Sequence, residues 1–299
     1  MQRARLRIMH TMHTMRDQPL ILRFDSATDV GRVRANNEDS VLVDPALGLV
    51  ILADGMGGHN GGEVASKMVT DIVRDYLVAQ GARDALACLD EASSRQTLLR
   101  EAIALANNQI RALSQSQHQL LGMGTTIVLG LFRHDQLTIA HVGDSRAYRL
   151  RHHQLEPLTR DHSSAQRECD AGLLQPAQMA QASNRHWLTR AVGVMPEVIV
   201  DFSEQTVRAG DSFLFCSDGL YEHLSVTTMC ALLGAPEGGL NTACLQLIAA
   251  ANAQGGRDNM SVVLVRAEKS KTSFFQARWR RIAPLFWRIR KTAFLWFEK

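Results

Sequence analysis

Cysteine is scarce in this sequence, and the spacing of the cysteines matches neither a disulfide framework nor a metal site. The five residues are odd in number and form no Cys-x-x-Cys pair. This argues against a disulfide framework or a zinc site and favours reduced thiols in the cytoplasm. No apolar run reaches about 18 residues, so no segment is expected to span a membrane. The basic first residues lack the apolar core of a secretory signal.

Positive charge is weak overall and is concentrated at one end of the chain. The net charge of +3 over 299 residues is too small to predict nucleic-acid binding. Residues 269–299 contain nine of the 33 Lys and Arg residues and a single acidic residue, Glu298. The chain as a whole is 45% hydrophobic and 21% charged, which is typical of a globular protein.

Three parts are therefore expected. Residues 1–20 form a basic extension that is either disordered or follows a misassigned start, because four methionines fall within the first fifteen residues. Residues 21–268 form the globular domain. Residues 269–299 form a tail that, as a helix, places apolar side chains on one face and basic ones opposite, although Pro284 would interrupt it. Such a helix suits an anionic membrane surface, a groove on a partner protein or the chain's own domain.

Short β-rich segments dominate the middle of the chain, and helical periodicity appears between them. The predicted strands are residues 49–53, 125–132, 136–142, 145–150, 212–216 and 260–266; the predicted helices are 64–79, 97–113 and 242–253, and residues 161–186 are a short helical insertion. Because the helices are bunched between runs of strands, the pattern favours an α+β fold, an antiparallel layered sandwich, over βαβ alternation.

Four aspartates stand at the rims of strongly apolar predicted strands: Asp54, Asp144, Asp218 and Asp258. Any one of them could initiate a turn by bonding to its own backbone. An aspartate beside a sheet core is poorly placed unless its charge is compensated, so four together favour convergence on cations. Ligation by oxygen atoms alone is the preference of Mg²⁺ or Mn²⁺ rather than of zinc.

The segment that follows Asp54, residues 55–62, is rich in glycine. A flexible turn is one explanation. A P-loop is excluded because no Gly-Lys-Ser or Gly-Lys-Thr follows, and the next acidic residues come too early for a dinucleotide fingerprint. Beside cations, Gly55 could present its carbonyl oxygen, and a side chain there would obstruct the metal or its substrate.

Arg34, Glu38 and Asp39 form a further charged group near the amino-terminal end. Taken alone, they would be a solvated, salt-bridged turn. Beside two metals they gain a use, because the planar fork of arginine binds two phosphate oxygens and carboxylates can hold water in place. The chemistry that needs both parts is phosphate-ester hydrolysis by water that two metals activate.

Eight segments in one order resemble the metal-dependent serine/threonine protein phosphatases of the type 2C class, in their bacterial branch. They read Arg-x-x-Asn-Glu-Asp, Asp-Gly-Met-Gly-Gly-His, Gly-Thr-Thr, Val-Gly-Asp-Ser-Arg, Asp-His-Ser, Leu-Thr-Arg-Ala-Val-Gly, Ser-Asp-Gly-Leu and Gly-Gly-x-Asp-Asn, and begin at Arg34, Asp54, Gly124, Val142, Asp161, Leu188, Ser217 and Gly255. The resemblance covers residues 24–267. It implies two stacked antiparallel β-sheets flanked by helix pairs (an αββα sandwich), with residues 161–186 as the flap beside the active site.

The resemblance also implies a metal ligand set. Asp54 would bridge two Mn²⁺ or Mg²⁺ ions, and the carbonyl of Gly55 would bind one of them. Asp218 and Asp258 would be ligands of the other ion. Bacterial members can take a third, weaker ion, which would be held by Asp144 together with Asp218.

The remaining matched residues would act on water and phosphate. Glu38 and Asp39 would act on the metals through water, and Arg34 would bind the phosphate. Where this chain has Met56, animal members often have a histidine that is proposed to protonate the leaving oxygen. Met56 cannot do so; His59 is a candidate substitute, and the alternative is that His59 contacts substrate or structure while water supplies the proton.

The leading hypothesis is a phosphatase for phosphoserine and phosphothreonine on proteins that opposes a bacterial serine/threonine kinase. It would act in the cytoplasm, or at the inner face of the membrane if the tail binds there. The expected partners are phosphorylated proteins and a cognate kinase, with no nucleic acid. A catalytically silent regulator of the same fold is the alternative, although silent members usually lose an aspartate and all four are present here. A small-molecule phosphoesterase also stays open on the metals alone.

Overall fold

The structure is a computed structural model that describes residues 20–58, 60–81, 90–234 and 238–270. One compact unit comprises Leu22–Ala267, and a second comprises the two ends of the chain, Met1–Ile21 and Glu268–Lys299. Nearly all of the second unit lies outside the described residues, as do residues 1–19 of the predicted amino-terminal extension and almost all of the predicted tail. The fold below is that of the first unit. Within the described ranges, no helix is both long and apolar enough to cross a membrane.

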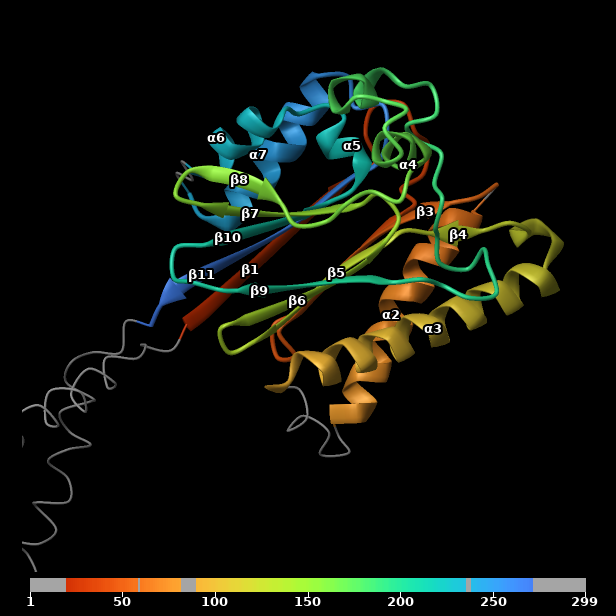
Figure 1. The fold of residues 1–299 in the computed structure, drawn as a ribbon, viewed down its shortest axis with the longest axis horizontal. Coiled ribbons are helices and arrows are strands. Elements are labelled where there is room, and N and C mark those ends of the chain that lie inside the picture. The colour runs from red at the N-terminus through yellow and green to blue at the C-terminus, as the bar shows by residue number, and fades with distance from the viewer. Residues whose placement is uncertain (1–19, 59, 82–89, 235–237, 271–299) are drawn as a thin grey trace, which may run out of the picture. The chain divides into compact units, whose positions relative to one another are not determined.

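Two antiparallel sheets form the centre of the unit (Figure 1). The five-stranded sheet has the order β1 (Leu20–Asp29), β11 (Met260–Lys269), β10 (Ser212–Cys216), β7 (Arg146–Arg151) and β8 (Gln154–Pro157). The six-stranded sheet has the order β2 (Asp39–Asp44), β3 (Leu49–Met56), β5 (Ile127–Arg133), β6 (Gln136–Val142) and β9 (Asp201–Thr206), and the short β4 (Gly124–Thr125) pairs with β3. The inner faces meet through aromatic rings: Phe132 of β5 and Phe213 of β10 make an edge-to-face contact with centroids 5.5 Å apart.

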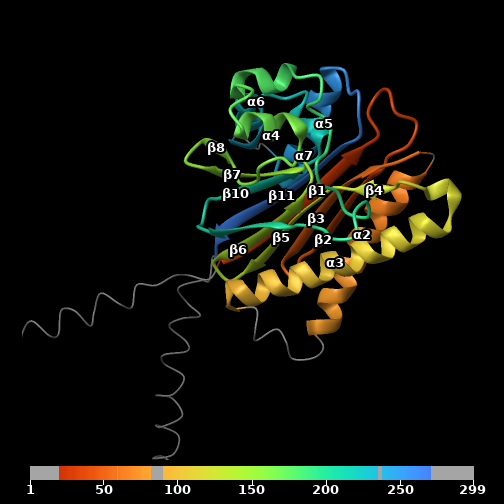
Figure 2. The same ribbon diagram turned by 45° about the vertical axis from the view of Figure 1, so that its right-hand side comes forward.

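A pair of helices covers the outer face of each sheet (Figures 1 and 2). Helices α2 (Gly61–Gly81) and α3 (Ala92–Ser116) pack on the six-stranded sheet in one hydrophobic cluster, and α6 (Val226–Gly234) and α7 (Leu240–Ala253) pack on the five-stranded sheet in another. The buried stripe of α3 includes Leu99, Ile103, Ala106 and Ile110, at the spacing that places side chains on one helical face. The predicted αββα sandwich is confirmed.

Among the described residues, four short helices connect the longer strands and helices along the chain. They are the 3₁₀ helix His118–Leu120, α4 (Ser164–Asp170), the 3₁₀ helix Pro176–Gln181 and α5 (Asp218–Tyr221). Two of them fall within the predicted helical insertion at residues 161–186. The predicted single strand 125–132 is wrong in one respect, because the chain divides into β4 and β5 at Thr126. The N–H of Thr126 keeps the register of the pairing with β3 and donates to the carbonyl of Asp54 at 2.8 Å, but the N–H of Asp54 donates to Oγ1 of Thr126, at 3.0 Å, instead of to its carbonyl.

The hairpin between β7 and β8 turns on two histidines in an unusual conformation. Arg151 pairs with Gln154, so His152 and His153 form a two-residue turn with φ of 51° and 60°. Left-handed backbone at both positions suits Asn-Gly, whereas histidine is strained there. We expect His152→Asn with His153→Gly to raise the free energy of unfolding by about 1–2 kcal/mol in urea denaturation. As a control, His118→Asn, at a position without positive φ, should not raise the free energy of unfolding. If the hairpin variant is no more stable than the original chain, the two histidines are not strained.

Candidate active site and metal centre

Strand pairing brings the predicted acidic residues to one edge of the sandwich. In the β2–β3 ladder Asp39 lies directly opposite Asp54. Asp218 follows β10 and Asp258 precedes β11; because these two strands are antiparallel, the end of one lies beside the start of the other. Asp144 follows β6 in the turn toward β7. A cavity of about 740 Å³ opens at this edge, and six predicted site residues line it together with Gly55: Arg34, Glu38, Asp54, Asp144, Asp218 and Asp258.

The carboxylates at this edge disfavour one another's ionised forms. Burial, followed by repulsion from neighbouring carboxylates that include Asp39, raises the pKa of Asp54 well above its usual range. Burial and the charge of Asp144 do the same to the pKa of Asp218. Burial is the main cause that raises the pKa of Asp39 to about 6 and that of Asp144 to about 7. A bound positive charge would favour the ionised forms of these carboxylates.

Two carboxylate oxygens of the cluster have no bonded partner among the described residues. Within the described part of the chain, Oδ1 of Asp39 and Oδ1 of Asp218 are shielded from solvent and have no hydrogen-bond partner. Shielded carboxylate oxygens are ordinarily paired, so an unpaired one requires an explanation. Oxygen-rich, negatively charged and unsatisfied, the donor set fits divalent cations such as Mn²⁺ or Mg²⁺.

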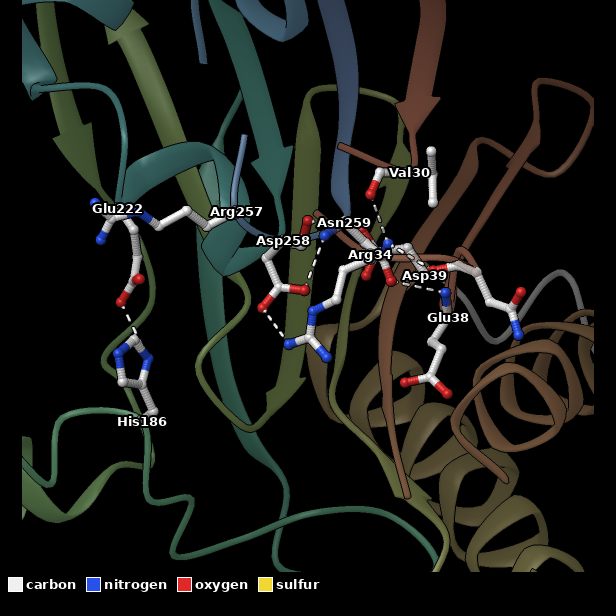
Figure 3. Close-up of polar contacts among 12 residues, drawn as sticks. Val30, Arg34, Glu38, Asp39, His186, Glu222, Arg257, Asp258 and Asn259 are labelled. Atoms are coloured by element: carbon white, nitrogen blue, oxygen red, sulfur yellow. Dashed lines mark hydrogen bonds and ion pairs between the residues drawn. The ribbon is translucent and has the colours of Figure 1, made fainter. Parts of the chain in front are cut away.

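Arg34, in the segment between β1 and β2, supplies a positive charge to the cavity. Its Nη2 donates to Oδ2 of Asp258 at 2.8 Å, and the hydrogen bond raises the pKa of the guanidinium (Figure 3). The sequence predicted separate roles for these two residues, one for phosphate and one for metal. The structure adds that they pair directly with each other. The guanidinium remains half-exposed, so its other nitrogens can reach a ligand.

Asn259 is a positioning residue that the sequence analysis missed (Figure 3). Its Oδ1 accepts the backbone N–H of Glu38 at 2.8 Å, and its Nδ2 donates to the carbonyls of Val30 at 3.1 Å and Asn36 at 2.9 Å. The buried amide therefore fixes the segment that carries Arg34 and Glu38 beside the start of β11. The Asp-Asn motif was visible in the sequence, but the three backbone partners were not.

Gly55 is required by the packing of the backbone around it, independently of any bound metal or substrate. A β-carbon there would lie 2.1 Å from the carbonyl oxygen of Gly62 and 2.6 Å from that of Glu38. Both contacts are with backbone and cannot yield, so close packing of three chain segments already requires glycine at this position. The expectation that glycine keeps this position open for metal or substrate is therefore not needed to explain it.

Thr126 holds the backbone of Asp54 from the neighbouring strand. The N–H of Asp54 donates to Oγ1 of Thr126 at 3.0 Å, and the N–H of Thr126 donates to the carbonyl of Asp54 at 2.8 Å. The same Oγ1 lies 2.8 Å from Oγ of Ser145, next to Asp144. One hydroxyl thus links the turns that carry two of the predicted ligands.

Thr126→Val should weaken Mn²⁺ binding by about 10-fold, because the isosteric methyl leaves the N–H of Asp54 without an acceptor. Isothermal titration calorimetry checks this directly. Thr126→Ser keeps the hydroxyl and should keep the affinity within about 3-fold. Equal weakening in both variants would show that packing of the methyl, and not the hydrogen bond, is what matters.

A second polar cluster lies behind Asp144 and was also missed. Gly143 and His162 exchange two hydrogen bonds, from Gly143 N to Nδ1 at 3.1 Å and from His162 N to the carbonyl of Gly143 at 2.9 Å. His162, His141 and Asp201 lie close enough to hold a metal ion. Arg190 already fills that place, with Nη1 2.7 Å from Oδ1 of Asp201 and 3.1 Å from Nε2 of His162. We therefore assign the cluster to holding the Asp144 turn.

The end of the predicted flap, residues 161–186, contacts the end of α5. Nδ1 of His186, the last residue of that segment, lies 3.1 Å from Oε1 of Glu222 (Figure 3). His186 lines the cavity that holds the carboxylate cluster, as does Met56. The predicted proton donor His59 lies outside the described residues.

Comparison with known proteins places these features in context. The family model described as Protein phosphatase 2C matches residues 31–237. The serine/threonine protein phosphatase PstP of Mycobacterium tuberculosis is 37% identical over 82% of this chain, which spans only 45% of that protein's length. The serine/threonine phosphatase stp of Listeria monocytogenes is 36% identical over 81% of this chain and 94% of its own.

Solved structures show the same similarity in three dimensions. The catalytic domain of PstP in complex with two manganese ions has a TM-score of 0.70 at 36% identity, over 83% of this chain and 99% of the other. PppA of Pseudomonas aeruginosa, described as a key regulatory component of T6SS, has a TM-score of 0.71 at 31% identity, over 82% and 97%.

Proposed function

The chain belongs to the protein phosphatase 2C family, and from that membership we propose that it hydrolyses phosphoserine and phosphothreonine on proteins. One observation carries the proposal. The cavity is lined by the predicted acidic residues, among them Asp218 with an oxygen that no described residue pairs, and by a half-exposed guanidinium. That combination suits a phosphate ester that binds with divalent cations. Residues 21–268 are the proposed phosphatase domain.

The ligand set is proposed residue by residue. Asp54, the Gly55 carbonyl, Asp218 and Asp258 would hold two Mn²⁺ or Mg²⁺ ions, with Glu38 and Asp39 acting through water. Asp144 with Asp218 would hold a third, weaker ion. When bound, such ions neutralise the phosphate and make water available as a nucleophile near neutral pH.

The chain's own residues would orient the reactants. Arg34 would bind phosphate oxygens through the guanidinium nitrogens that its pairing with Asp258 leaves accessible. Asn259 would keep Glu38 and Arg34 in register with β11. The donor of the proton to the leaving oxygen stays a prediction, with His59 as the candidate.

The test is hydrolysis of a phosphothreonine peptide in Mn²⁺, with and without EDTA. We expect turnover that the chelator abolishes and that Arg34→Ala lowers by about 10²-fold in kcat/KM. Arg208→Ala, an exposed arginine on the loop before β10, is the control and should be unchanged. No turnover from folded, Mn²⁺-loaded protein would favour the silent regulator. Turnover of p-nitrophenyl phosphate without peptide turnover would favour a small-molecule phosphoesterase.

The cellular setting is proposed on the family alone. A phosphoprotein phosphatase reverses a kinase, so a bacterial serine/threonine kinase is the proposed counterpart. Cytoplasmic location, with contact to the membrane or a partner through residues 269–299, belongs to the same proposal.

A further inference from the structure

We propose that Val194 and Met195 form an apolar ledge that selects protein substrates with an apolar side chain next to the phosphorylated residue. The inference rests on the proposed function and deepens it. Val194 is 44% exposed and Met195 is 59% exposed, and both line the cavity that holds the carboxylate cluster. Met56, Leu188 and Ala191 line the same cavity, so its wall is polar in one part and apolar in another.

The ledge stands on a backbone that is held in place. Val192 exchanges hydrogen bonds with Thr125 of β4 at 2.8 and 3.0 Å. Asn107 of α3, which is 1% exposed, accepts the N–H of Gly193 at 2.7 Å and donates to the carbonyl of Met195 at 3.0 Å. A buried side chain whose polar atoms all form hydrogen bonds with one loop fixes the conformation of that loop.

Glycines on both sides let the ledge sit where it does. Gly193 has a φ of +90°, and a β-carbon there would lie 2.3 Å from the side chain of Ile110. A β-carbon on Gly124 would lie 2.7 Å from Cγ2 of Val194 and 3.0 Å from Cε of Met56. Val194 therefore packs over Gly124 beside Met56 and still presents part of its surface to the cavity.

The occupant that fits is the stretch of protein chain around a phosphorylated residue. Once a phosphate lies at the carboxylate cluster with its cations, the neighbouring residues of the substrate must cross the rim of the cavity. An acidic neighbour would meet Glu38 and Asp258, which line the same space. An apolar neighbour gains by covering Val194 and Met195, because contact between apolar surfaces removes both from water.

The test is a set of phosphothreonine peptides that differ only by Leu or Ser at each of the two positions on either side of the phosphothreonine. We expect one position at which Leu is preferred by about 10-fold in kcat/KM with Mn²⁺. Val194→Thr with Met195→Gln preserves shape but adds polar atoms, and should reduce that preference below about 3-fold. Val226→Thr on α6, where the valine is 47% exposed, is the matched control and should keep the preference.

Each outcome decides the inference. It is overturned if no flanking position prefers Leu, or if the preference for Leu survives in the double variant of the ledge. If the double variant does not fold, Met195→Gln alone replaces it in this test. p-Nitrophenyl phosphate separates the two proposals, because it carries no flanking residues. Mn²⁺-dependent turnover of that ester without a peptide preference overturns the ledge and leaves metal-dependent hydrolysis standing. No turnover of any substrate overturns both.

Discussion

Replacing Asp218 with asparagine is expected to remove phosphatase turnover and at the same time to stabilise the metal-free protein. Turnover should fall by about 10²- to 10⁴-fold, because the variant lacks a carboxylate proposed to hold a cation. The free energy of unfolding without metal should rise by about 1–3 kcal/mol, because Asp218 is repelled by Asp144, Asp258 and Asp39 and no bonded partner compensates its shielded Oδ1 within the described residues. Peptide hydrolysis and urea denaturation in EDTA measure the two effects.

Asp211→Asn is the matched control for this result. Asp211 is 2% exposed, but it is paired, with Oδ1 2.7 Å from Nε of Arg151 and Oδ2 2.6 Å from Nη2. The same substitution there should lower stability and leave turnover per folded molecule intact, since Asp211 lies outside the catalytic cavity. If Asp218→Asn destabilises the metal-free protein as Asp211→Asn does, the carboxylate cluster is not repulsive and the reasoning for a cation site loses its main support.

The second large effect is a pH-dependent stabilisation by Mn²⁺. Without metal, Asp144 and Asp39 have pKa values of about 7 and about 6 in the folded protein, above the ordinary aspartate value. The folded state therefore holds more protons than the unfolded state between those values and about pH 4, and stability falls as pH rises through that window. Burial lowers the pKa of His162 to about 4, which acts in the opposite sense below about pH 6.5. The raised pKa values of Asp54 and Asp218 act with those of Asp144 and Asp39, so the carboxylates dominate.

Cations should reverse this dependence because they compete with protons for the same oxygens. At about 100 times its dissociation constant, Mn²⁺ should add about 2.7 kcal/mol per site at pH 8, which is about 5–10 °C in Tm for a domain of this size. At pH 5 the shift should be small. Thermal melts in EDTA and in Mn²⁺ across this range give the result, with Asp218→Asn as the variant that should lose the shift. Equal Mn²⁺ shifts at pH 5 and pH 8 would show that the carboxylates are not the ligands.

The sequence predicted the centre of the fold better than its edges. The six predicted strands include β3, β6, β10 and β11, whose continuous apolar runs reflect burial on both faces. Strands β1, β2 and β9 were missed because they are only partly buried and mix polar with apolar residues. Strand β8 has four residues and ends at Pro157, so it leaves almost no periodic signal.

In the site, too, local sequence patterns predicted some features and long-range contacts determine the others. An aspartate that ends an apolar strand is a local pattern, which is why the acidic residues could be named from the sequence. The pairing of Arg34 with Asp258 joins residues 224 positions apart in the sequence. The contacts of Asn259 with Val30 and Glu38 have similar separations in the sequence. These contacts depend on the pairing of β11 with β1, so no local pattern could indicate them.

The carboxylates come from both halves of the sandwich. Asp39, Asp54 and Asp144 belong to the six-stranded sheet and its turns, whereas Asp218 and Asp258 belong to the five-stranded sheet. The hydrogen bond from Ser217 Oγ to Asp39 Oδ2, at 2.8 Å, is one of the polar links between the two halves at this edge. Cations shared by the two sets would act as a mechanical cross-link between the sheets. If the proposed cations bind there, their removal would weaken the contact between the two sheets as well as stop hydrolysis.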